Sequence, residues 1–101
     1  IHVSAGSDWP VTPHDPMEAI RIAVTRRSAD ADDDAWLPHE RLTAEEALHA
    51  YTAEVAYQAF ADDRRGRLRV GGVADLVLLG ADPRRAAPME LGDIAVLGTW
   101  L

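Results

Sequence analysis

The sequence contains no cysteine, no lysine and no long apolar run. Without cysteine, the chain can form neither a disulfide framework nor a thiolate metal site. A membrane-spanning helix needs about 20 consecutive apolar residues, so the sequence predicts no membrane segment. The first residues also lack the basic start and apolar stretch of a signal peptide, which predicts a cytoplasmic protein.

Basic charge is scarce as well, since 10 arginines face 17 acidic residues and the net charge is -7. Such a chain repels a phosphate backbone, so nucleic acid is not an expected partner. The use of arginine alone, beside abundant alanine and aspartate, indicates a GC-rich bacterial coding bias. The chain starts without methionine inside a predicted strand and stops inside another at GTWL. We therefore expect a piece of a longer protein.

The segment HDPME predicts the start of a helix over residues 16–27. Asp15 can cap it, Pro16 suits the first helical position, and Glu18 can reach back to the cap. The sequence ADADDDA at 29–35 then predicts an acidic, solvated loop. An EF-hand calcium loop is rejected, because its sixth and twelfth places would hold alanine and arginine instead of glycine and glutamate.

A second helix is predicted over residues 43–60, where Thr43 and Glu46 form a capping box. An apolar stripe predicts its packing face and consists of Leu48, Tyr51, Val55 and Ala59. Beyond Gly66 the pattern becomes typical of strands. The predicted strands lie at 3–6, 67–70, 75–79 and 94–98. The sequence therefore predicts an α/β chain with a boundary near residues 64–66.

The run GSDWPV at residues 6–11 places an aspartate directly after the first predicted strand. Asp8 can be a turn residue, since Gly, Ser, Asp and Pro all favour turns. It can also be a catalytic carboxylate at the mouth of a barrel. Trp9 either lines a substrate pocket or packs under the loop. His14 either lines the same pocket or is exposed to solvent.

Three motifs occur in series: GSDWPV, LTAEEAL followed by YT, and G-x-L-x-x-G-x-x-A-D-L-V. Together they resemble the C-terminal end of the metal-dependent amidohydrolase superfamily. The closest branch contains the N-substituted formamide deformylases and YtcJ-like proteins. The resemblance is carried by Gly6, Ser7, Asp8, Trp9, Pro10, Leu42, Thr43, Glu46, Ala47, Tyr51, Thr52, Ala56, Gly66, Leu68, Gly71, Ala74, Asp75, Leu76 and Val77. Gly72 departs from it, because relatives often carry lysine there.

The resemblance implies an α/β fold in two parts. Residues 1–64 would be the end of a (β/α)8 TIM barrel, with its last strand and the helices that follow. Residues 65–101 would be the C-terminal strands of a small β-sandwich built from both ends of the chain. In such barrels the active site lies at the C-terminal ends of the strands, where Asp8 would lie.

The implied function is metal-dependent hydrolysis of a non-peptide, amide-type carbon–nitrogen bond in a small molecule. Asp8 would bind a divalent metal, expected to be zinc, and act as general base and acid. Trp9 and His14 would contact the substrate. The other metal ligands of the family belong to earlier strands, so we expect this piece to be inactive alone. Its uncovered strand edges and helix faces predict association, as in a homo-oligomer.

Two alternatives from other functional classes stay open. The protein can be a degenerate homologue that keeps the barrel without the metal ligands. It can also be an independent interaction module of 101 residues. A His-x-His motif in the upstream sequence would favour the enzyme, and a start codon immediately before Ile1 would favour the module.

Overall fold

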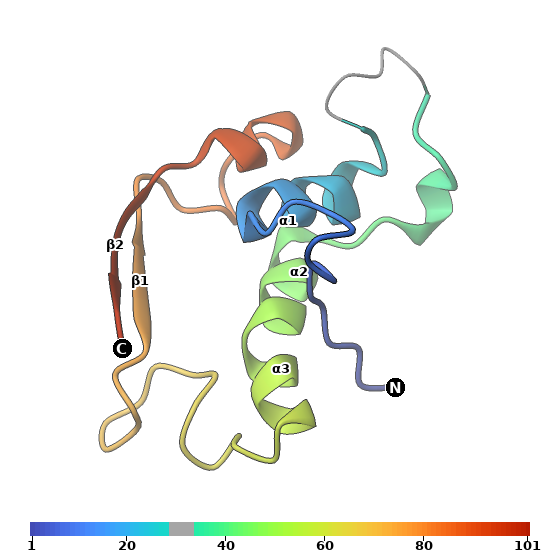
Figure 1. Ribbon diagram of the computed structural model, residues 1–101. Helices are drawn as coiled ribbons and strands as arrows, with labels where there is room; N and C mark the ends of the chain where they lie inside the picture. The colour runs from blue at the N-terminus through green and yellow to red at the C-terminus, as the bar shows by residue number, and fades with distance from the viewer. Residues whose placement is uncertain (29–33) are drawn as a thin grey trace.

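The computed structural model describes residues 1–28 and 34–101 (Figure 1). The elements in chain order are α1 (Pro16–Thr25), the 3-10 helix η1 (Pro38–Glu40), α2 (Ala44–Tyr51), α3 (Ala53–Gln58), β1 (Leu76–Leu79), the 3-10 helix η2 (Pro88–Asp93) and β2 (Val96–Trp100). The predicted mixture of helix and strand is confirmed. The acidic loop predicted at 29–35 falls mostly on residues 29–33, which lie outside the described residues.

Helix α1 begins where the sequence predicts. The side chain of Asp15 accepts a 2.9 Å hydrogen bond from the backbone N–H of Met17, and Pro16 takes the first helical position. The helix ends at Thr25, earlier than the predicted residue 27. It stops there because Arg26 adopts the left-handed conformation, with φ 57°. The sequence also predicts that Glu18 bonds back to the cap, and this is wrong: its carboxylate accepts hydrogen bonds from Arg21 instead.

The helix predicted over 43–60 is two helices, α2 and α3, with a break at Thr52. The capping box at its start is confirmed: the N–H of Thr43 donates to Glu46 over 2.8 Å, and the N–H of Glu46 donates to Thr43 over 3.2 Å. At the break, the Thr52 hydroxyl donates to the C=O of Leu48 over 2.8 Å. Such side-chain bonds to the helix backbone bend helices, which gives a physical reason for the interruption.

The buried face of α2 and α3 consists of small side chains. Its members are Ala47, Ala50, Ala53 and Ala56. The predicted stripe is therefore wrong in part, because Val55 and Ala59 are exposed and only Leu48 and Tyr51 are half-buried. Alanines bring neighbouring backbone close, and the N-terminal segment and the loop at Gly66 lie against this face.

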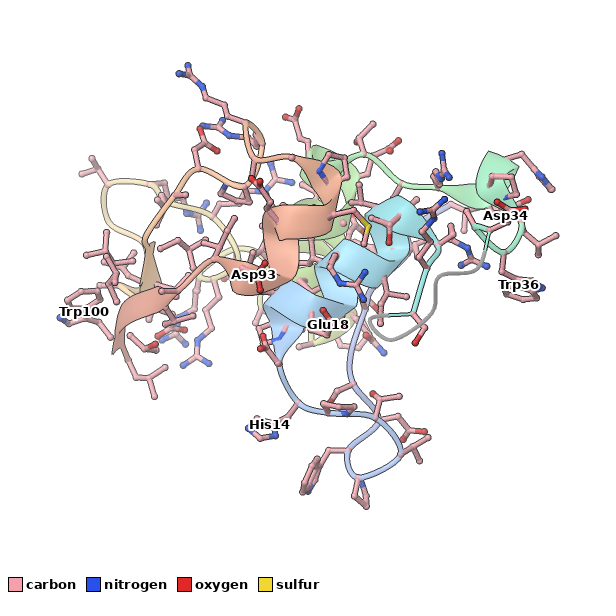
Figure 2. All side chains as sticks on the ribbon, turned by 90° about the horizontal axis from the view of Figure 1, so that it is seen from above. His14, Glu18, Asp34, Trp36, Asp93 and Trp100 are labelled. Atoms are coloured by element: carbon pink, nitrogen blue, oxygen red, sulfur yellow. The ribbon has the colours of Figure 1, made fainter. Side chains whose placement is uncertain are left out.

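The core forms between α1, α2 and the η2 segment. The cluster of buried residues contains Met17, Ile20, Ala47, Leu91 and Ile94. Figure 2 shows η2 lying along α1, with Glu18 and Asp93 labelled on the two elements. None of the predicted helices and strands covers residues 88–93, yet η2 forms there and buries Leu91 completely.

Strands β1 and β2 pair antiparallel, with Leu76 opposite Trp100 and an irregularity between Leu78 and Leu79. The strands predicted near 75–79 and 94–98 are thus confirmed, the second shifted toward the C-terminus. Those predicted at 3–6 and 67–70 are wrong: these residues are irregular. Over 3–6 the chain lies against a helix, where strand pairing has no partner. Among the described residues, no helix is long and apolar enough to cross a membrane.

Candidate functional site

Asp8 lies in a tight, exposed turn ahead of α1. The N–H of Val11 donates to the C=O of Asp8 over 2.8 Å, and the hydroxyl of Thr12 donates to the C=O of Ser7. Asp8 itself has φ 50°, in the left-handed region that aspartate tolerates better than most residues. Asp8 is therefore the first residue of an exposed turn, and its C=O and that of Ser7 close the turn.

Trp9 and His14 lie together on this same loop. Their rings meet edge to face, with centroids 5.2 Å apart. The Trp9 side chain is 66% exposed, so it does not pack under the loop. Figure 2 shows His14 on the outside of the chain, away from the core. The structure thus brings an exposed indole and an imidazole next to the Asp8 turn.

The residues of this loop do not complete a metal site. Across residues 1–28 and 34–101, no group of three His, Asp or Glu residues is placed to hold a metal ion. A zinc site typically needs three or four protein ligands. Asp8 offers one suitable oxygen ligand, so the described part of this chain does not fit a metal by itself.

A second polar cluster, which the sequence did not indicate, joins the N-terminal segment to α2 and α3. Nδ1 of His2 lies 2.7 Å from Oε2 of Glu54, and Nδ1 of His49 lies 3.3 Å from Oε1 of the same carboxylate. No motif of the sequence marks His2 or His49 as a site residue. His2 and Glu54 are 52 positions apart in the sequence, so no local pattern of residues indicates their contact.

Two carboxyl groups have lowered pKa values because arginine side chains donate hydrogen bonds to them. Two hydrogen bonds of 2.7 Å from Arg21 lower the pKa of Glu18, so Glu18 binds Arg21 instead of reaching back to its helix cap. Hydrogen bonds from Arg84 lower the pKa of Asp82 to about 2. Both pairs are local ion pairs and indicate structural roles.

One family model and several known proteins match the chain. The amidohydrolase family model matches residues 1–101. The chain is 41% identical over 80 residues to Protein LONG AFTER FAR-RED 3 of Arabidopsis thaliana, covering 79% of this chain and 14% of that protein. It is 34% identical over 102 residues to the N-substituted formamide deformylase of Arthrobacter pascens, covering 100% of this chain and 18% of the deformylase.

A third relative is YtcJ of Bacillus subtilis (strain 168), an amidohydrolase by name, 33% identical over 89 residues that cover 87% of this chain and 17% of YtcJ. No solved structure matches the chain. The chain thus spans between 14% and 18% of the length of these relatives. The predicted resemblance is confirmed. Because the family model covers the whole sequence, the chain belongs to the amidohydrolase family.

Proposed function

We propose that this chain is the C-terminal part of a metal-dependent hydrolase that cleaves a non-peptide, amide-type carbon–nitrogen bond in a small molecule. Membership of the amidohydrolase family supports hydrolysis. The name of one relative, N-substituted formamide deformylase, supports an amide-type substrate. Because the chain spans only 18% of that relative, we assign the activity to a longer protein that contains this chain.

Within that protein, residues 1–64 form the end of the catalytic barrel and residues 65–101 belong to a composite β-sandwich. The distribution of elements supports this division, because α1 to α3 precede residue 64 and both strands follow it. The ribbon of β1 and β2 leaves Val77 56% and Leu97 63% exposed. A two-stranded ribbon is marginal alone, and further strands would cover these side chains.

The observation that carries the proposal is the unused carboxylate of Asp8. An aspartate that serves a turn usually bonds nearby backbone N–H groups with its side chain. Asp15 does so with Met17, and Asp82 does so with Arg84 over 3.0 Å. In the described part of the chain, no hydrogen bond engages the Asp8 side chain. The exposed Asp8 carboxylate is therefore free to act as a functional group in the longer protein.

The proposed chemistry needs an attacking water and a polarised carbonyl, and a divalent metal supplies both when bound. Asp8 is one ligand of the required kind, and the remaining ligands would come from the rest of the longer protein. The carboxylate of Asp8 takes a proton from the attacking water and delivers it to the departing amine nitrogen. Trp9 and His14 line the substrate side of this loop.

The test is Asp8→Asn in the full-length enzyme, assayed on an amide-type substrate that the parent hydrolyses. A general acid–base group contributes about 10²–10⁴-fold, so kcat should fall by at least that factor. Ser7→Ala, one residue away, is the matched control and should cost far less. A near-normal kcat for Asp8→Asn would make Asp8 a turn residue. Full-length protein that binds no metal and is inactive on a broad amide panel would favour the degenerate homologue.

A further inference from the structure

Glu54 on α3 lies between two imidazole rings that come from different parts of the chain. His2 and His49 approach its two carboxylate oxygens at 2.7 and 3.3 Å. The Glu54 side chain is only 15% exposed, so groups of the protein contact its carboxylate more than water does. The ring of His2 also stacks on Tyr57, with centroids 4.1 Å apart and planes 18° from parallel.

These contacts fix the N-terminal segment on the helices. The hydroxyl of Ser4 donates to the side-chain oxygen of Gln58 over 2.5 Å, and the N–H of Ala5 donates to the C=O of Ala50 over 3.1 Å. Residues 1–5 form no strand within this chain, and these contacts join them to α2 and α3. The segment leads through Gly6 and Ser7 directly into Asp8.

We propose that Glu54 is a positioning residue for Asp8. By holding His2, it fixes residues 1–5 on α2 and α3, and with them one end of the Asp8 turn. The other end is fixed by the cap of α1 at Asp15. Loss of the contact between Glu54 and His2 lets the Asp8 turn move as a unit. The effect on catalysis rests on the proposed function, whereas the anchoring of the segment does not.

The anchoring is tested by amide hydrogen exchange with Glu54→Ala in the protein. Exchange at the Ala5 amide should accelerate by about tenfold or more, while the Ile20 amide within α1 keeps its protection. Glu45→Ala is the matched control, because Glu45 lines the same hollow as Glu54. Glu54→Gln can still accept a hydrogen bond from His2 and should restore part of the protection. Unchanged exchange at Ala5 in Glu54→Ala would overturn the proposal.

The positioning effect is tested by kinetics of the full-length enzyme. A displacement of about 1 Å can cost about 10²-fold, so Glu54→Ala should lower kcat by about 10- to 100-fold with little change in KM. Glu54→Gln should lie between this variant and the parent. If Asp8→Asn abolishes turnover while Glu54→Ala retains full kcat, the positioning role is wrong. If Asp8→Asn retains kcat, the proposed function fails, and the exchange at Ala5 still decides whether Glu54 anchors the segment.

Discussion

Leu91 is the side chain on which the packing of η2 against α1 depends most. It is 0% exposed and belongs to the buried cluster with Met17, Ile20, Ala47 and Ile94. Leu91→Ala removes three carbon groups, which costs about 2.4 kcal/mol at about 0.8 kcal/mol per buried CH₂. The cavity left behind adds about 1 kcal/mol. We therefore expect the free energy of unfolding to fall by about 3 kcal/mol.

The assay is equilibrium urea unfolding followed by circular dichroism. Leu97→Ala is the matched control, since the same atoms are removed from a side chain that is 63% exposed on β2. The control should lose no more than about 0.5 kcal/mol. Should Leu91→Ala be too unstable to fold, Leu91→Val provides a smaller step in the same direction. Equal losses at positions 91 and 97 would refute the packing of η2 on α1.

Two further predictions concern a close backbone contact and acid stability. Gly66 has φ +81°, and an added Cβ would lie 2.7 Å from Ala56, whereas Gly71 has φ +82° and open space. Gly66→Ala should therefore cost about 1–3 kcal/mol more than Gly71→Ala in urea unfolding, and equal costs would contradict this contact. Arg21 holds the pKa of Glu18 below 4.5, so this pair stabilises the fold above that pH and stops doing so as pH falls through the lowered pKa. Glu18→Gln should flatten this acid limb of the stability curve, and an unchanged limb would contradict the pairing.

Local signals made the helix starts predictable. A cap needs only residues within one turn of each other, so the sequence contains all the information. Asp15 and the pair of Thr43 and Glu46 therefore form the bonds that their spacing predicts. Glu18 is the exception, because Arg21 lies three residues further along and offers two charged hydrogen bonds. These are stronger than the single bond to the cap N–H.

Long-range packing made the rest unpredictable. No helical periodicity marks η2, whose existence depends on Leu91 entering a cluster that α1 and α2 build. The break at Thr52 likewise leaves the apolar pattern of the helix intact. The strand predicted at 3–6 fails for a related reason: no strand in the described part of this chain lies beside these residues, and the backbone N–H of Ala5 donates to a helix carbonyl instead.

The candidate site also has a part that local sequence indicates and a part that depends on long-range packing. The motif GSDWPV offered a turn at Asp8 as one of two interpretations, whereas the contact of Trp9 with His14 is seen only in the structure. The family that the three motifs in series indicated is confirmed by the comparisons. The contact of His2 with Glu54 joins residues 52 positions apart, and only the fold reveals it.

The backbone of Asp8 explains why its turn needs anchors at both ends. A residue other than glycine at φ 50° is in a sparsely populated conformation, which persists only where the surroundings over-determine it. The cap at Asp15 is local and holds one end, whereas His2 and Glu54 hold the other through the tertiary fold. Asparagine tolerates this conformation as well as aspartate does. Asp8→Asn therefore removes the charge and keeps the turn, whereas alanine would change both, so asparagine is the substitution that separates proton transfer from backbone conformation.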